Sequence, residues 1–124
     1  MKIALTLVGA ALAGTGFAPA APVTIEYSPA RLARDGRTIA WTWTVRNTGA
    51  SVGDLTVVHR LRPRLDVVAV TPGCAATAGG VRCGYGALPA GGRRTGRLVA
   101  RVPDGAKGTV RIGGTVTWRR AAPR

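Results

Sequence analysis

His59 is the only histidine of the chain and the side chain best suited to acid–base chemistry near neutral pH. Nucleophilic catalysis would require Ser28, Ser51 or a free Cys beside it, together with an acid that orients the ring. Nothing in the spacing indicates such a triad. His59 instead alternates with Val57 and Leu61, the apolar residues of one strand face. We interpret it as a partly buried structural histidine.

The five acidic residues are scattered along the chain, and three of them stand beside glycine in turn contexts, at Asp35, Asp54 and Asp104. A glycosidase needs two facing carboxylates, which this distribution does not predict. Two cysteines and one histidine are also too few ligands, at the wrong spacing, for a metal site. The sequence therefore predicts a non-enzymatic protein that uses no cofactor.

The first 21 residues have the pattern of a secretory signal peptide. Lys2 precedes an apolar run at residues 3–12, and an Ala-x-Ala segment ends at Ala20. An uncleaved membrane anchor is the alternative, but the run is shorter than the roughly 20 residues that a bilayer requires. We expect cleavage after Ala20 or Ala21 and no transmembrane segment in the mature chain. The protein is then secreted, and either free or associated with the cell wall.

Cys74 and Cys83 are the only two cysteines, and in an exported chain they are expected to form a disulfide. The bond would close a ten-residue loop and stabilise the fold by roughly 2–3 kcal/mol. A redox role is disfavoured because the spacing is not that of a Cys-x-x-Cys motif. The pair is predicted to be a structural staple.

Alternating apolar and polar residues dominate residues 22–120, which are long enough for one domain, followed by a short tail at 121–124. About seven such segments, separated by turn residues, are typical of an all-β fold, an immunoglobulin-like antiparallel β-sandwich. An up-and-down barrel is the alternative. Asn47-Thr48-Gly49 predicts a turn, because Asn and Gly tolerate positive φ. Gly113-Gly114 predicts a bulge or a close backbone approach in the last strand.

The inward residues of these strands form the predicted core. They are Ile39, Trp41, Trp43, Val45, Val57, Leu98, Val116 and Trp118. Exposed tryptophans would instead make a stacking platform for sugars. The tryptophans share their strand faces with aliphatic residues, however, which favours core packing.

The charge balance is strongly positive, with a formal net charge of +13, or +12 once Lys2 is removed with the signal. Sixteen of the 18 basic residues are Arg, whose guanidinium binds phosphate or carboxylate through two parallel hydrogen bonds. A GC-rich codon bias explains Arg over Lys, but it does not explain the scarcity of acids. A functional electropositive surface and a solvated face that only keeps the domain soluble both remain open.

Outward arginines of the last two strands would form a cationic stripe if those strands pair with each other. The full set of candidate polyanion-binding residues is Arg60, Arg62, Arg64, Arg93, Arg94, Arg97, Arg101, Arg111 and Arg119. Affinity for polyanions would fall steeply as salt rises. No sequence-specific nucleic-acid binding is indicated.

Three features recur in order along the chain: the Asn47-Thr48-Gly49 turn, the pair Cys74 and Cys83, and the Gly-x-Leu-x-x-Gly segment at 86–91. Over roughly Ile25 to Trp118, they resemble a bacterial conserved-repeat domain of unknown function, number eleven in its series. The resemblance implies an immunoglobulin-like module of secreted and surface proteins, commonly present in tandem copies. It implies no common catalytic activity.

The chain departs from this resemblance at three points. It contains a single copy of the module. His59 stands where members usually have Asp, and Arg62-Pro63-Arg64 stand where they usually have Pro-Ala-Gly. Any role of the missing Asp is not carried over, and an individual function is expected near these arginines.

Two functions are expected from these observations. The first is a non-enzymatic envelope module held to anionic cell-wall polymer by an Arg-rich face. The second is an adhesion or assembly module that pairs with another surface protein through a strand edge. Glycan binding by exposed tryptophan is a third hypothesis.

Overall fold

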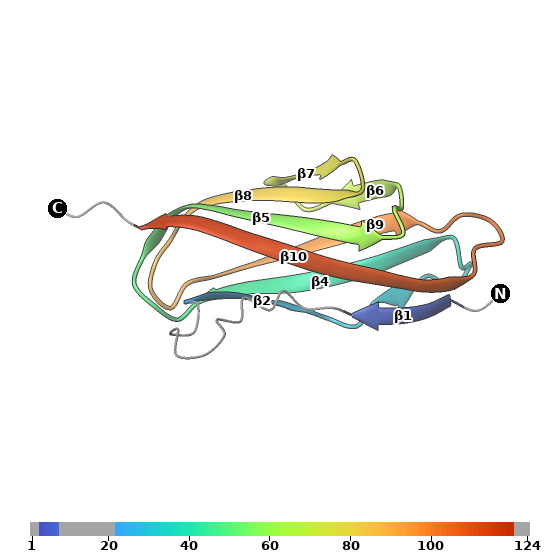
Figure 1. Ribbon diagram of the computed structural model, residues 1–124, viewed down its shortest axis with the longest axis horizontal. Helices are drawn as coiled ribbons and strands as arrows, with labels where there is room; N and C mark the ends of the chain where they lie inside the picture. Colours follow the sequence, from blue (N-terminus) through green and yellow to red (C-terminus); the bar gives the residue numbers. More distant parts are fainter. Residues whose placement is uncertain (1–2, 8–21, 121–124) are drawn as a thin grey trace.

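The computed structural model describes residues 3–7 and 22–120 and arranges them as two β-sheets packed face to face (Figure 1). The strands are β1 (Ile3–Leu7), β2 (Val23–Tyr27), β3 (Arg31–Leu32), β4 (Thr38–Asn47), β5 (Val52–Arg62), β6 (Val67–Val70), β7 (Cys74–Thr77), β8 (Gly80–Leu88), β9 (Arg93–Arg101) and β10 (Gly108–Arg120). Sheet 1 has the order β1-β10-β5-β8-β7. Sheet 2 has the order β2-β4-β9-β6, with β3 also paired to β4. The predicted all-β sandwich is confirmed.

The strand order is that of an immunoglobulin-like sandwich. The order β2-β4-β9-β6 corresponds to the A-B-E-D sheet of that fold, and the adjacent strands β5 and β10 correspond to C and F. The β7–β8 hairpin widens sheet 1 on the other side of β5. Among the described strands, β1 alone pairs in parallel, with β10.

Seven strands, β2, β4, β5, β6, β8, β9 and β10, coincide with the alternating segments of the sequence. The short strands β3 and β7 were not predicted, and β1 falls within the predicted signal peptide. The rest of that segment, 1–2 and 8–21, and the tail 121–124 lie outside the described residues. Within residues 3–7 and 22–120, no helix has the length and apolar character needed to cross a membrane.

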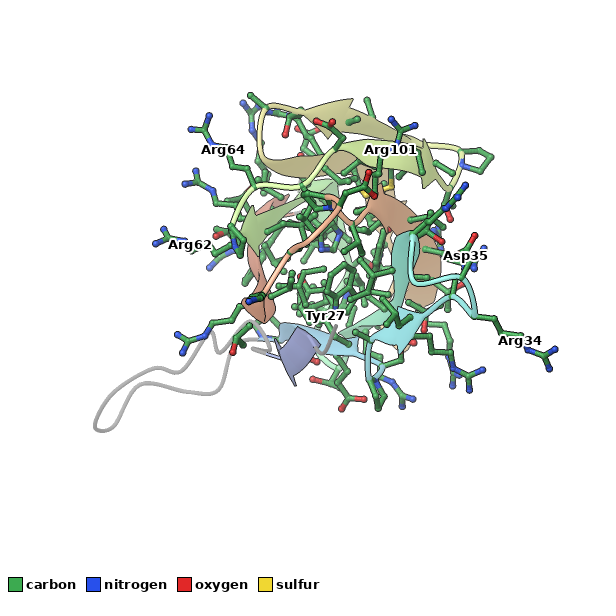
Figure 2. The ribbon with its side chains drawn as sticks, turned by 90° about the vertical axis from the view of Figure 1, so that its right-hand side faces the viewer. Tyr27, Arg34, Asp35, Arg62, Arg64 and Arg101 are labelled. Carbon is green, nitrogen blue, oxygen red and sulfur yellow. A yellow bond between two sulfur atoms is a disulfide. The ribbon has the colours of Figure 1, made fainter. Side chains whose placement is uncertain are left out.

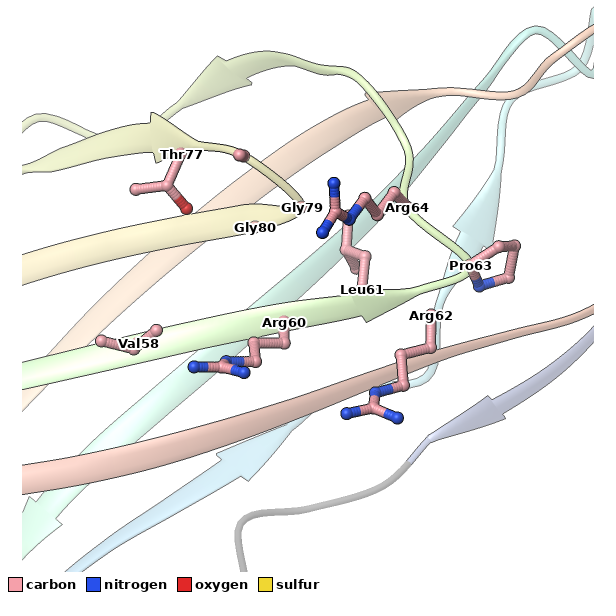
Figure 3. Close-up of a pocket in the computed structure, with 10 residues that line it drawn as sticks. Val58, Arg60, Leu61, Arg62, Pro63, Arg64, Thr77, Gly79 and Gly80 are labelled. Atoms are coloured by element: carbon pink, nitrogen blue, oxygen red, sulfur yellow. The ribbon is translucent and has the colours of Figure 1, made fainter.

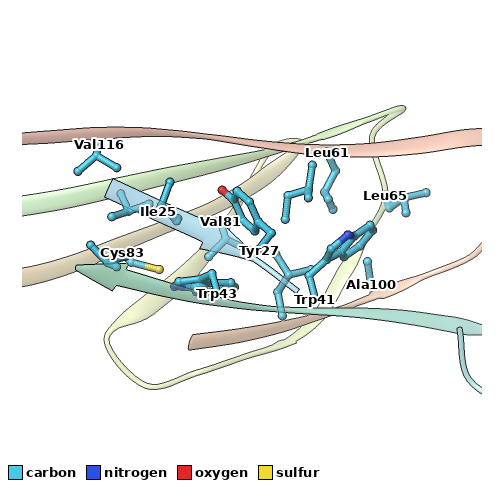
Figure 4. Close-up of a cluster of buried hydrophobic side chains, with 14 of the residues drawn as sticks. Ile25, Tyr27, Trp41, Trp43, Leu61, Leu65, Val81, Cys83, Ala100 and Val116 are labelled. Atoms are coloured by element: carbon cyan, nitrogen blue, oxygen red, sulfur yellow. The ribbon is translucent and has the colours of Figure 1, made fainter. Parts of the chain in front are cut away.

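The core lies between the sheets and contains the large residues of β4 (Figure 4). Trp41 and Trp43 are 1% and 2% exposed. Gly96 stands opposite Trp43 in β9, and a Cβ at Gly96 would run into the Trp43 ring, so glycine is required there. Buried with the two tryptophans are Ile39, Val45, Val57, Leu98 and Val116.

Trp118 is only partly buried, although its strand parity predicts a core position. The register of β10 against β5 shifts between Thr117 and Arg119, and such an irregularity re-aims the side chain it carries. Gly113 and Gly114, where the bulge was predicted, pair in regular register, and a Cβ at Gly113 would meet nothing within 4 Å. The prediction of a bulge there is wrong, because the irregularity falls at Trp118.

The predicted turn after β4 forms for a reason other than positive φ, since neither Asn47 nor Gly49 has one. The Asn47 side chain is 1% exposed, and its Nδ2 donates to the carbonyl oxygens of Ala50 (2.9 Å) and Leu88 (3.1 Å). Its Oδ1 accepts from the Gly49 amide at 2.9 Å. Asn47 therefore ties the β4–β5 turn to the end of β8.

The last two strands, β9 and β10, belong to different sheets, so the condition for the cationic stripe, that these strands pair, is not met. β9 is flanked by β4 on one side and β6 on the other and has no free edge for β10. The connection at 102–107 leaves sheet 2, where Val102 N donates to Arg37 O at 2.8 Å, and β10 then pairs with β5 in sheet 1. The sequence neighbours β9 and β10 therefore present their outward side chains on opposite sides of the sandwich.

The predicted disulfide joins Cys74 and Cys83, which stand opposite each other in the β7–β8 hairpin. We expect the Cys74→Ala/Cys83→Ala variant to lose roughly 2–3 kcal/mol of unfolding free energy, because the bond restricts the unfolded chain. Denaturant unfolding of the oxidised and reduced protein measures this loss. Reductant must leave the double variant unchanged, and an equal stability of the oxidised and reduced wild type would contradict the staple role.

Candidate functional site

Three strands of sheet 1 carry outward arginines that lie close together. Arg62 in β5 stands directly opposite Arg111 in β10, and Arg60 stands opposite Gly113. Arg82 extends the group onto the next strand, β8. All four arginines are exposed. We call Arg60, Arg62, Arg82 and Arg111 the sheet 1 arginine face.

A shallow hollow of about 490 Å³ adjoins this face and connects the end of β5 to the β7–β8 turn (Figure 3). Arg60 and Arg62 project from the same side of β5. Arg64 packs over Gly79, where an added Cβ would approach the Arg64 Cγ and Nε to 3.3 Å. Because Gly79 and Gly80 carry no side chain, the three arginines line a hollow with backbone on its other side.

Acidic side chains do not neutralise the sheet 1 arginine face. Within the described part of the chain, the one ion pair shorter than 4.0 Å joins Arg119 Nε to Asp54 Oδ2 at 3.5 Å, and both side chains are largely exposed. Like charges that stand directly opposite each other destabilise a strand pair. Arg62 and Arg111 therefore repel each other, and the face is an uncompensated positive surface.

Other predicted arginines do not join this face. Arg93, Arg97 and Arg101 lie on the outer face of sheet 2, so the single stripe predicted across the last two strands does not exist. Arg94 alternates with these arginines and therefore lies on the inner side of β9. Burial raises the pKa of Tyr85 in β8, and the positive charge of Arg94 opposes this rise. The candidate set thus divides between two sides of the sandwich.

The candidate set also omits three exposed arginines on the outer faces, Arg31, Arg46 and Arg82. The alternation around Arg46 and Arg82 already indicates that both point outward, so the sequence contained that signal. β3, which carries Arg31, is two residues long, too short for alternation in the sequence to indicate which way Arg31 points.

His59 is fully buried between the sheets, deeper than predicted. Its Nδ1 lies 2.7 Å from Tyr27 Oη, and its ring lies against Trp43 with centroids 4.0 Å apart. The Trp43 indole in turn donates to Tyr85 Oη at 2.8 Å. Tyr27 and Trp43 belong to sheet 2, whereas His59 and Tyr85 belong to sheet 1. These four side chains, the inter-sheet cluster, therefore connect the two layers.

Burial lowers the pKa of His59 to about 4, and burial also raises the pKa of Tyr27. His59 Nε2 has no hydrogen-bond partner among the described residues. Ser28, proposed as a nucleophile only in combination with His59, bonds instead to Thr42 Oγ1 at 2.7 Å. A neutral, enclosed ring without a neighbouring nucleophile supports the structural interpretation.

The tryptophans offer little surface for stacking on sugars. Trp41 and Trp43 are buried, and Trp118 is partly buried. In the ranges that the structure describes, no three His, Cys, Asp or Glu residues gather into a group that would hold a metal ion.

Comparison with models of known protein families and with curated proteins found no match for this chain. The resemblance to the bacterial repeat domain therefore remains a prediction that rests on the residues quoted for it. The structure itself defines a class of protein: a disulfide-linked all-β sandwich whose two outer faces both carry exposed arginines.

The buried His59 predicts a specific loss of stability in acid. The unfolded chain binds a proton at His59 near the ordinary pKa of 6.5, whereas the folded protein binds it only near 4. Stability is therefore complete above about pH 6.5 and falls by about 3 kcal/mol as the pH drops to 4. Denaturant unfolding across this range measures the loss. The His59→Gln variant keeps an acceptor for Tyr27 without titrating, and an unchanged pH dependence in it would contradict the assignment.

The opposed pair Arg62 and Arg111 predicts that a charge reversal stabilises the fold. Arg111→Glu replaces repulsion by attraction and is expected to raise the unfolding free energy by about 0.5–1 kcal/mol at low salt. Arg111→Gln, which only removes the repulsion, should lie between the wild type and Arg111→Glu. Thermal unfolding at low and high salt measures these differences. Stability that falls from wild type to Gln to Glu at low salt would contradict the repulsion.

Proposed function

We propose that this chain is a non-enzymatic, exported module that binds anionic polymer of the cell envelope through the sheet 1 arginine face. The observation that carries the proposal is the directly opposed pair Arg62 and Arg111, with Arg60 two residues away and no ion pair to an acid within 4 Å among the described residues. An anionic ligand would relieve the repulsion within this pair. Anion binding is therefore favoured at the same two arginines whose repulsion destabilises the free sheet.

Arginine is chemically suited to this ligand. The guanidinium remains charged at physiological pH and makes two parallel hydrogen bonds to phosphate or carboxylate oxygens. Neighbours on one sheet face lie roughly 5 Å apart across strands and roughly 7 Å apart along a strand. This spacing lets adjacent guanidiniums contact successive anionic groups of one polymer chain.

Export is supported by two independent features. The N-terminal residues have the signal-peptide pattern, and the Cys74–Cys83 bond is typical of proteins that fold in an oxidising compartment. Envelope polymers are then the anions that the exported protein meets first.

Strand-edge pairing is the second candidate, and the edge of β10 favours it. The other edge strands are protected from pairing with another chain because they are short. β2 has five residues and is flanked by Pro22 and Pro29, and β6 and β7 have four residues each. β10 has 13 residues, and its edge accepts Ile3–Leu7 as a parallel strand. Removal of a signal peptide that contains β1 would open this edge to a strand of another protein.

Salt titration of the exported protein on isolated cell walls separates the two candidates. Electrostatic binding predicts retention at low salt and release at about a few hundred millimolar salt, because each arginine that binds the polymer releases condensed counterions. Arg62→Glu/Arg111→Glu should be released at lower salt. The slope of log affinity against log salt should fall by about one unit for each arginine that no longer binds the polymer.

A matched control has the same change of net charge on loop residues outside the outer faces of both sheets. Arg34→Glu/Lys107→Glu meets this condition, since both residues are exposed and lie between strands. Its salt release should remain close to that of the wild type. Absence of retention at low salt would overturn the polymer proposal, and retention that is insensitive both to salt and to Arg62→Glu/Arg111→Glu would favour the strand-edge candidate.

A further inference from the structure

The outer face of sheet 2 carries a second group of exposed arginines. Arg93, Arg97 and Arg101 recur at every fourth position of β9, and Arg46 in β4 stands directly opposite Arg93. Glu26 of β2 lies on this face, the Asp66 carbonyl accepts from the Arg101 amide at 2.8 Å, and Asp35 and Asp104 line a hollow together with Arg101. None of these four acids makes an ion pair within 4 Å among the described residues. We call Arg46, Arg93, Arg97 and Arg101 the sheet 2 arginine face. Like sheet 1, it contains an opposed Arg–Arg pair.

A groove of about 440 Å³ between β3 and β9 adjoins the sheet 2 arginine face. Arg31 and Arg97 line it together with the hydroxyls of Ser28, Thr38 and Thr42. Ser28 Oγ accepts hydrogen bonds from Thr42 N at 3.1 Å and from Thr42 Oγ1 at 2.7 Å, which fixes these two side chains against the sheet. The Thr42 hydroxyl already donates to Ser28 and the Ser28 hydroxyl to Pro29 O, so the guanidiniums of Arg31 and Arg97 are the donors that suit an anionic group.

The two arginine faces point in opposite directions. Their strands belong to different sheets, and on both faces the arginines alternate with inward residues. In Figure 2, Arg62 lies at the left of the sandwich and Arg101 near its top. The opposed pairs also lie at opposite ends: Arg62 and Arg111 where β5 finishes, and Arg46 and Arg93 where β4 finishes (Figure 1). A ten-residue strand such as β4 spans roughly 30 Å. A short polymer segment bound to one pair therefore does not reach the other.

We infer that the domain bridges two anionic polymer chains, one on each outer face. This inference rests on the proposed function and adds a second binding site to it. The two faces are connected by a packed core, so their relative direction is fixed. A rigid protein with two opposed sites cross-links polymer, and it is retained by a network more strongly than either site alone would hold it.

Light scattering of purified poly(glycerol phosphate) titrated with the exported protein tests the inference. The wild type should raise scattering to a maximum and then lower it, since excess protein saturates each chain singly. Arg62→Glu/Arg111→Glu removes the opposed pair of the sheet 1 arginine face, and Arg46→Glu/Arg93→Glu removes that of the sheet 2 arginine face. Each variant should lower the maximal scattering at least about tenfold while it still binds immobilised polymer at low salt.

Two controls separate bridging from simpler explanations. Arg34→Glu/Lys107→Glu has the same net charge as either face variant and should scatter like the wild type, which excludes neutralisation by total charge. An equimolar mixture of the two face variants should scatter no more than each alone, because neither has two sites. Light scattering of the protein without polymer must show a monomer, since a dimer that offers one face from each copy would also cross-link polymer.

The outcomes distinguish this inference from the proposed function. Face variants that cross-link as well as the control, loss of all polymer binding after mutation of one face, or a dimer without polymer would overturn bridging. In each of these cases the wild type still binds polymer, and the proposed function stands. A wild type that binds no polymer at low salt would overturn both.

Discussion

The contact between Trp43 and His59 determines how the two sheets face each other, and the outer surfaces depend on it. Trp43 extends from sheet 2 against His59 of sheet 1, and the Tyr27–His59 bond crosses the same gap. Side chains alternate along a strand, so an inward His59 places Arg60 and Arg62 outward. A slip of one residue in β5 would bury these arginines without partners, at a cost far above that of any surface interaction. The inter-sheet cluster therefore fixes the arginine faces without touching them.

Topology then decides which arginines become neighbours. Arg101 and Arg111 are close in the sequence, yet they lie on opposite faces because β9 and β10 belong to different sheets. Arg62 and Arg111 are far apart in the sequence, yet they stand directly opposite each other. The surface charge of this domain is thus organised by strand order and not by runs of basic residues, and a second face follows from the same order.

Strand positions and inward residues were predictable because a period of two is local. The Cys74–Cys83 bond was predictable because the chain offers one pairing. The sheet to which each strand belongs was not predictable, because alternation shows which face of a strand a residue occupies but not which strand pairs with it. A connection as short as 102–107 fits either a hairpin or a crossing between sheets. The irregularity at Trp118 and the bond from His59 to Tyr27, 32 residues away, likewise depend on partners that only the folded sheet supplies.

Codon composition accounts for many arginines, but it does not choose their partners. It would place acids and arginines on strand faces without regard to the residue opposite. In this sandwich both outer faces contain an Arg–Arg pair at directly opposed positions, and the Arg119–Asp54 ion pair lies away from them. Each opposed pair destabilises the sheet by no more than about 1 kcal/mol, which is small beside the burial of the two large indoles of the core. The core can therefore tolerate repulsion on both faces, as the proposed binding of anionic polymer requires.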